Sequence, residues 1–178
     1  EHMTLEFAKL HGAGNDYIAV DGRGIDRDWG ALSVEMSRLA FGVGSDGIVL
    51  VQDSDVAQIR MRVYNPDGSE AEMSGNGIRL FSKFVIDRKI TVPANEGLMV
   101  ETGSGVRTVW PSMEGDKMVD AKVAMGAPTF VPSEIPVDVG QIGDLDIVKA
   151  YPIQAGGREL KITCLAVGNP HAVVVMDE

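Results

Sequence analysis

One segment of this 178-residue chain constrains its fold more than any other. Residues 77–88 carry apolar side chains at helical spacing, and these spread widely enough around the helix to indicate that it is well buried. The segment stands among many short runs that alternate, such as IRMRV at 59–63, a pattern typical of half-buried strands. A few helices among many short strands predict an α+β fold rather than alternating βαβ units.

A second helical pattern covers residues 28–40, with Asp28 available as its N-cap. Residues 126–136 hold three prolines and are the best domain boundary, so we expect one domain at 4–126 and another at 127–178. Glu1, His2 and Met3 look like a tag remnant. The expected apolar stripe of the second helix consists of Trp29, Leu32, Met36 and Leu39.

The composition excludes several classes of protein. With 26 acidic against 16 basic residues the net charge is -10, which argues against a nucleic-acid or anionic-membrane partner. A single cysteine, Cys164, excludes a disulfide framework and a thiolate metal cage, so we expect no metal. No apolar run approaches the roughly 18 residues of a membrane span, and we expect a cytoplasmic protein. The 21 glycines indicate many tight turns, or backbone held close to a ligand.

The glycine cluster GVGSDG at 42–47 fits the G-x-G-x-x-G pattern of dinucleotide sites. That mechanism needs a strand before the glycines and a helix after them, so that the helix N-terminus meets the pyrophosphate. Here the expected helix precedes and an apolar strand at 48–51 follows. The cluster is therefore interpreted as a helix-to-strand turn.

Two other turns carry candidate ligand contacts. HGAGNDY at 11–17 joins two short strands; Gly14 and Asn15 could simply accept positive φ, or Asn15 could offer its donor and acceptor to the charged ends of an amino acid. NPDGSE at 65–70 has turn chemistry, and its carboxylates lack the spacing of a calcium loop. Asn65, at the end of a strand, remains a candidate ligand contact.

The most informative stretch is EMSGNGIR at 72–79, because Gly75 and Asn76 at a helix start expose free N–H groups to a carboxylate or phosphate. Ser74 is either an ordinary N-cap or the position of the reacting group. In GNPH at 168–171 a turn explains the first three residues, and His171 is either a polar cap or a site residue.

Together these motifs resemble one family. HGxGNDY, FGxGxDG, YNxDGSExEMxGNGxR and GNPH, in this order from Phe7 to His171, are similar to diaminopimelate epimerase. The resemblance implies a pseudo-symmetric two-domain α+β fold, each half a curved sheet wrapped around a central helix, with the active site in the cleft between the halves. It also implies cofactor-independent interconversion of LL- and meso-diaminopimelate by a two-base mechanism, in bacterial lysine and peptidoglycan precursor synthesis, and suggests a homodimer.

By the same resemblance, Asn15, Asn65 and Asn169 contact the substrate, Gly75 and Asn76 hold its α-carboxylate, and His171 lies near the reacting thiols. Position 74 is the place of one of the two catalytic cysteines of the family, and here it is Ser74.

The second family cysteine lies downstream of residue 178, and family chains complete their first domain with a C-terminal strand. Cys164, in the middle of an expected strand, is interpreted as a small core residue. The chain is therefore expected to hold the first domain and an incomplete second one, and to be inactive or nearly so. Ser74 is either an engineered change or a natural variant. The alternatives are a non-catalytic module that binds amino-acid carboxylates, and a related racemase or isomerase with another substrate.

Overall fold

The computed structural model describes residues 4–176, so the tag remnant at 1–3 lies outside the described residues. The chain divides into two compact units, one ending at Ala124 and one beginning at Met125. They are named unit 1 and unit 2.

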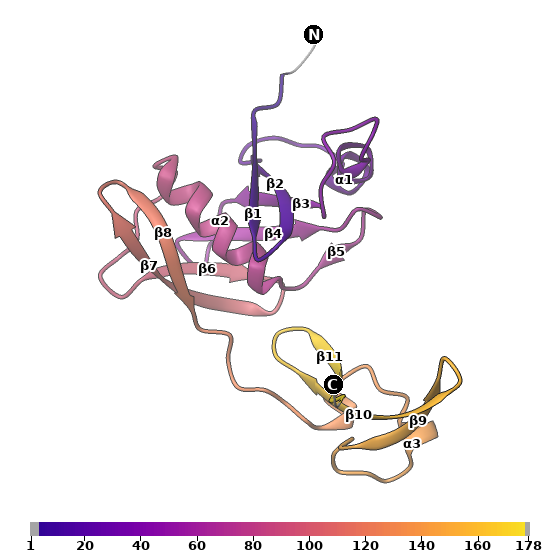
Figure 1. The fold of residues 1–178 in the computed structure, drawn as a ribbon. Coiled ribbons are helices and arrows are strands. Elements are labelled where there is room, and N and C mark those ends of the chain that lie inside the picture. The colour runs from indigo at the N-terminus through magenta and orange to yellow at the C-terminus, as the bar shows by residue number, and fades with distance from the viewer. Residues whose placement is uncertain (1–3, 177–178) are drawn as a thin grey trace. The chain divides into compact units, whose positions relative to one another are not determined.

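Unit 1 is a strongly curled sheet that wraps around one helix (Figure 1). Along the sheet the strands follow the order β1-β2-β3-β4-β6-β7-β8, and the short β5 pairs with β4. Neighbours pair antiparallel except β2 with β3 and β4 with β6, which are parallel. The strands span Phe7–Gly12 (β1), Asn15–Asp21 (β2), Ile48–Gln52 (β3), Ile59–Tyr64 (β4), Glu70–Ala71 (β5), Leu98–Thr102 (β6), Gly105–Glu114 (β7) and Lys117–Val123 (β8).

The enclosed helix, α2 (Gly75–Asp87), is the buried helix that the sequence predicts. Ile78, Phe81 and Val85 are fully buried against the surrounding strands. The helix begins two residues before the expected Gly77, because Ser74 caps it. The prediction of an α+β fold with a curved sheet around a central helix is confirmed.

The strands that hold the core behave as their sequences indicate. In β4 the apolar side chains of Ile59, Met61 and Val63 are buried while the two arginines between them are only half-buried. Residues 18–20 of β2 and 48–51 of β3 are buried on both faces. A continuous apolar run is typical of a strand enclosed on two sides.

The second predicted helix is α1 (Trp29–Ser37), and the Oδ1 atom of Asp28 accepts a hydrogen bond from Ala31 N at 2.9 Å, as expected of an N-cap. The stripe predicted for it is wrong at Leu39, whose side chain is 92% exposed. The helix ends at Ser37, and Gly44 N donates back to Met36 O at 2.9 Å. Because the chain reverses there, Leu39 falls outside the helical repeat.

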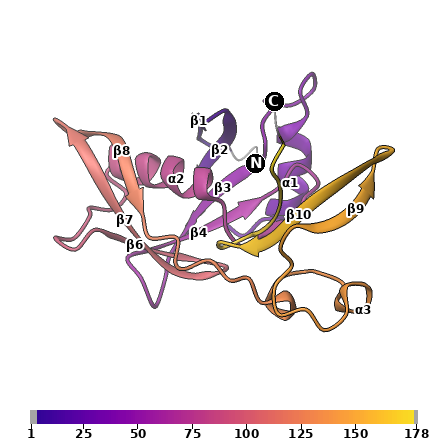
Figure 2. The same cartoon turned by 60° about the horizontal axis from the view of Figure 1, so that its bottom comes forward.

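Unit 2 contains a three-stranded antiparallel sheet in the order β11-β10-β9. Figure 2 shows β9 and β10 of this sheet side by side. Its small core consists of Ile135, Val148 and Cys164. Cys164 is buried in the middle of β10, so its interpretation as a core residue is confirmed. Among the described residues, no helix is long and apolar enough to cross a membrane. The elements are a 3-10 turn at Pro132–Glu134, α3 (Val139–Ile142), β9 (Tyr151–Ala155), β10 (Arg158–Ala166) and β11 (Pro170–Val174).

Candidate active site

The N-terminus of α2 is the centre of the candidate site in unit 1. Ser74 has extended backbone, and its Oγ accepts a hydrogen bond from Gly77 N at 2.9 Å. The N–H groups of Gly75 and Asn76 lie in the first turn, where no helical carbonyl precedes them. A side chain at Gly77 would begin 2.9 Å from Ser74 Oγ, so the tight cap requires glycine there. The result is a pair of backbone donors at the positive end of a thirteen-residue helix.

Ser74 therefore acts as an N-cap in this structure. The hydroxyl of Tyr17, a buried side chain of β2, lies 3.4 Å from Ser74 Oγ. A second group thus contacts the oxygen at position 74; Tyr17 is the last residue of the HGxGNDY motif, but the motif does not indicate this contact.

Asn15 lies beside this helix start because of the β1–β2 hairpin. Gly12 pairs with Asn15 across a two-residue loop, and the positive φ values fall on Ala13 (51°) and Gly14 (90°). Of the two alternatives for this turn, the one in which Gly14 and Asn15 accept positive φ holds for Gly14 and is wrong for Asn15, which is the first residue of β2. A two-residue hairpin loop of type I′ has positive φ at its own two residues and not beyond them.

The side chains of Asn15 and Asn76 contact each other directly. Asn76 Nδ2 donates to Asn15 Oδ1 at 2.6 Å, and Asn15 Nδ2 donates to Asp46 Oδ2 at 3.2 Å. At the other end, a guanidinium N–H of Arg79 donates to Asn76 Oδ1. Asn15 and Asn76, both predicted from the sequence, are thus hydrogen-bonded to each other. Asp46 and Arg79, which were not predicted as site residues, hydrogen-bond to them from either side.

Asn65 follows β4 directly and begins the predicted turn. Gly68 N donates to Asn65 O at 3.0 Å, and Asn65 Nδ2 donates to Ser69 Oγ at 2.9 Å. Ser69 Oγ in turn donates to Asp67 Oδ1 at 2.6 Å. The hydroxyl and the backbone N–H of Ser69 both lower the pKa of Asp67 below its ordinary value. The Asp67 carboxylate therefore stays ionised and is the final acceptor in the series of hydrogen bonds from Asn65 through Ser69.

The sheet brings Asn65 to the same end as Asn15. Ile48, the first residue of β3, pairs with Ile18 of β2 on one side and with Tyr64, the last residue of β4, on the other. The start of β2 and the end of β4 therefore lie at the same end of the sheet. A Cβ built on Gly47, next to Asp46, would lie 3.4 Å from the Cα of Asn65. Five predicted residues of unit 1 thus lie at one end of its sheet and helix: Asn15, Asn65, Ser74, Gly75 and Asn76.

Unit 2 carries the other two predicted residues. Asn169 Oδ1 and His171 Nε2 lie 3.1 Å apart, so the last residue before β11 contacts the second residue of that strand. His171 borders a hollow of about 150 Å³ that Ile135 and Cys164 also line. Both Asn169 and His171 are exposed.

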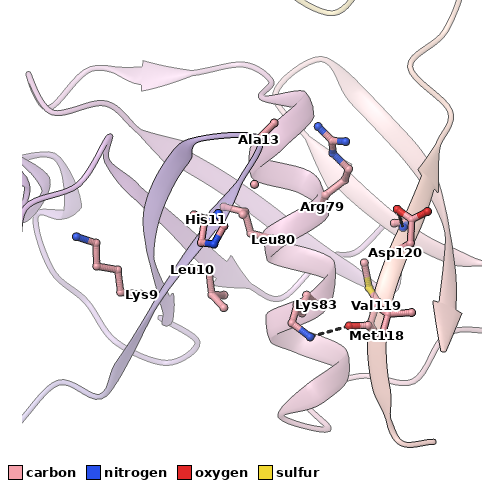
Figure 3. A pocket seen from close by; sticks show the side chains of 12 residues that line it. Lys9, Leu10, His11, Ala13, Arg79, Leu80, Lys83, Met118, Val119 and Asp120 are labelled. Carbon is pink, nitrogen blue, oxygen red and sulfur yellow. Dashed lines mark hydrogen bonds between the residues drawn. The ribbon is translucent and has the colours of Figure 1, made fainter. Parts of the chain in front are cut away.

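A separate hollow of about 350 Å³ lies over α2, between the edge strands β1 and β8 (Figure 3). His11, Leu80 and Met118 line it from the three elements. Lys83 Nζ donates to Met118 O at 2.6 Å and so ties β8 to the helix. None of the site residues predicted from the sequence lines this hollow.

In residues 4–176 no three His, Cys, Asp or Glu side chains gather as a metal site would require. The GVGSDG cluster follows α1 and precedes β3, the order expected for a helix-to-strand turn.

Comparison with solved structures identifies the fold. The chain superposes with a TM-score of 0.73 on a probable proline racemase from Agrobacterium radiobacter and with 0.69 on a hydroxyproline epimerase from Agrobacterium vitis. Each alignment covers 96% of this chain and about half of the other, 52% and 51%, at 14% identity. The chain thus shares the fold of these two proteins.

Sequence comparison identifies the particular family. A family model described as diaminopimelate epimerase matches residues 7–131. Relatives named diaminopimelate epimerase are 44% identical in Agathobacter rectalis, over 98% of this chain, and 42% identical in Methanothermobacter thermautotrophicus, over 97%. The chain belongs to the diaminopimelate epimerase family. It spans 62% and 60% of the length of these two relatives.

Proposed function

We propose that the protein of this chain interconverts LL- and meso-diaminopimelate, without a cofactor, by moving one proton at the α-carbon. Family membership supports the reaction, and one observation carries the assignment of the site. The free N–H groups of Gly75 and Asn76 form a carboxylate cradle at the start of α2, beside the side chain of Asn15.

The cradle suits the difficult step of this chemistry. Removing the α-proton of an amino acid leaves negative charge that spreads onto the α-carboxylate. Helix N–H groups that point at this carboxylate stabilise the added charge, since they are already oriented before the reaction. A base on one face takes the proton, and an acid on the opposite face returns one to the same carbon, so that the configuration inverts.

Ser74 is the reason why we propose that this chain itself is inactive or nearly so. The family carries a catalytic cysteine at this position, and a thiol with a free pKa of about 8.5 can lose its proton in a suitable site. A serine hydroxyl is a far weaker acid, and here its oxygen accepts a hydrogen bond from Gly77 N. A cysteine codon at position 74 in the source gene would make Ser74 an engineered change, and a serine codon would make it natural.

Unit 2 is proposed to contribute Asn169 to substrate binding and His171 to catalysis. The contact between Asn169 Oδ1 and His171 Nε2 supports this, because each side chain limits the rotation of the other. The division of the chain near residue 124 supports an N-terminal epimerase domain at 4–126 and the beginning of a C-terminal one at 127–178.

We also propose a cytoplasmic enzyme of lysine biosynthesis that binds neither nucleic acid nor membranes, and that pairs as a homodimer. The net charge of -10 supports the lack of an anionic partner. A bacterial source is part of this proposal, although the relatives include archaeal proteins.

A second function has one observation in its favour. Because the Ser74 side chain serves as an N-cap, the chain keeps the cradle while lacking a thiol there, as a non-catalytic module that binds amino-acid carboxylates would. A related racemase with another substrate is separated from both by deuterium exchange at the α-carbon across a panel of amino acids.

The cradle is tested by calorimetry with meso-diaminopimelate at millimolar concentration. Proline is tolerated in the first helical position, and the extended backbone of Ser74 suits a residue that precedes proline. Gly75→Pro therefore deletes one cradle N–H without breaking the helix, and Gly75→Ala is the matched control that keeps it. We expect about tenfold weaker binding for Gly75→Pro than for Gly75→Ala, the effect of one hydrogen bond to a charged group.

Equal affinity of these two variants, with the fold confirmed by circular dichroism, would contradict the proposal that the Gly75 N–H binds the carboxylate. Epimerisation by the unaltered chain at a rate comparable to an intact enzyme would contradict the role given to Ser74.

A further inference from the structure

We propose that Asp46 and Arg79 are positioning residues that fix the orientation of the two site amides, Asn15 and Asn76. This inference rests on the proposed function only for the identity of the ligand that the amides meet. The geometry that carries it lies wholly within unit 1.

The four side chains form one directed chain of hydrogen bonds. Arg79 donates to Asn76 Oδ1, Asn76 Nδ2 donates to Asn15 Oδ1 at 2.6 Å, and Asn15 Nδ2 donates to Asp46 Oδ2 at 3.2 Å. Each asparagine accepts from one neighbour through its oxygen and donates to the next through its nitrogen.

The two ends of the chain set its direction. A guanidinium has donors only and an ionised carboxylate has acceptors only, whereas an amide has both and can turn over. If the Asn15 amide turned over, its oxygen would face the Asp46 carboxylate and its NH₂ group would face the NH₂ group of Asn76. Both contacts would be repulsive, so Asp46 and Arg79 leave the two amides a single orientation.

Each end is itself anchored to the backbone. Asp46 Oδ2 also accepts from Asp16 N at 3.0 Å, and Asp46 N donates to Asp16 O at 2.7 Å, which ties this residue to the start of β2. Arg79 Nε donates to Gly75 O at 3.2 Å within the first turn of α2. The carboxylate and the guanidinium are therefore held in place from the elements that carry Asn15 and Asn76.

The function of this arrangement is to prepare the amides before a ligand arrives. Asn15, Asn76, Asp46 and Arg79 all keep some exposure to solvent, and a free amide in water would turn between two orientations. Fixing the orientation in advance removes an ordering cost from binding. Asp46 and Arg79 thus affect binding through the asparagines and need not touch the ligand.

The first test uses no ligand: the side-chain NH₂ signals of Asn15 and Asn76 in nitrogen-15 NMR spectra of the 178-residue chain. Asp46→Ala should shift the signals of Asn15 and also those of Asn76, one hydrogen bond further along. Asp46→Asn keeps an acceptor oxygen and should largely restore the parent signals. Asp55→Ala, at an exposed carboxylate between β3 and β4, is the control that should shift neither.

Unchanged Asn15 and Asn76 signals in Asp46→Ala would overturn the inference, whether or not the chain binds diaminopimelate. Equal shifts in Asp46→Ala and Asp46→Asn would also overturn it. They would show that the acceptor oxygen kept by Asp46→Asn does not restore the parent signals.

The second test measures affinity for meso-diaminopimelate by calorimetry. We expect about tenfold weaker binding for Asp46→Ala and for Arg79→Ala, and nearly parent affinity for Asp46→Asn. Parent affinity in both alanine variants would contradict the positioning role. Absence of binding by the parent chain would instead count against the proposed function, and the NMR test would still decide the orientation of the amides.

Discussion

The two units of this chain are built on cores of very different size. In unit 1 the helix α2 is enclosed by strands, and several of its side chains have no exposed surface at all. In unit 2, within residues 125–176, the buried apolar side chains are Pro132, Ile135, Val148 and Cys164, and β9 and β11 have none. Every side-chain ion pair formed among residues 4–176 also lies in unit 1.

This difference shows where the candidate site obtains its rigidity. The cradle and the amide chain stand on α2 and β2, whose apolar side chains are largely buried, and on Asp46, which follows the buried Ser45 in the turn before β3. Asn169 and His171 stand on a sheet whose core has three residues. Side chains carried by well-packed elements hold their geometry better than those carried by thinly packed ones.

The largest expected effect tests the core of unit 1. Phe81→Ala removes a fully buried side chain from the centre of α2 and should lower the free energy of unfolding by about 3–5 kcal/mol. Both tryptophans, Trp29 and Trp110, lie in unit 1, so their fluorescence during denaturation reports on this unit. Phe41→Ala, at a side chain that is 91% exposed, is the matched control and should change stability by about 0.5 kcal/mol at most. Equal effects of the two variants would contradict the enclosed core.

A smaller loss is expected in unit 2. Ile135→Ala opens a core of three residues that can partly collapse, so the cost should be near the lower end of the usual range, about 2 kcal/mol. Hydrogen exchange measures it at Cys164 N, which donates to Val148 O at 2.9 Å inside that core. Ile147→Ala, at an exposed isoleucine, should leave this exchange rate unchanged. If both variants left it unchanged, the three residues would not be the core of unit 2.

The smallest effect concerns pH. Arg62 donates two hydrogen bonds to Glu70, at 2.7 and 2.5 Å, and they lower the pKa of Glu70 below its ordinary value of 4.5 in spite of partial burial. A lowered folded-state pKa stabilises the fold above the ordinary value, and this stabilisation is lost as the pH falls through the lowered pKa.

Glu70→Gln should therefore cost about 0.2–1 kcal/mol at neutral pH, the range of exposed ion pairs, and the difference from the parent should vanish in acid. Denaturation of both proteins from pH 7 to pH 3, followed by tryptophan fluorescence, measures this. A difference that does not depend on pH would show that the pair contributes through packing alone.

The sequence predicts those parts of the fold that depend on local patterns. The burial of α2 can be predicted from the apolar side chains of a twelve-residue stretch. The alternation in β4 can be predicted from a stretch of six residues. The parallel pairings of β2 with β3 and of β4 with β6 are not predictable in this way, because they join segments separated by other elements. The prediction for Leu39 fails because a local helical period cannot show that the chain reverses after Ser37.

The candidate site divides in the same way. Asn15, Asn65 and Asn76 are recognisable because each stands in a turn or helix start with its own local signature. Asp46 belongs to the FGxGxDG motif, but the glycine cluster around it indicates only a turn and does not indicate a contact with Asn15. Its partner Asn15 is 31 residues away, and Asn76 is 61 residues from Asn15. Contacts of that separation exist only once the sheet has curled around the helix.

The enclosed helix also determines when this domain can fold during synthesis. Some strands that cover α2 precede it in the chain, whereas β7 and β8 follow it. A ribosome that has made the chain only as far as Asp87 therefore presents a helix with part of its apolar surface still uncovered. Such surfaces are where growing chains aggregate or recruit chaperones. The part of this surface that β7 and β8 cover stays open until the β7–β8 hairpin has been made.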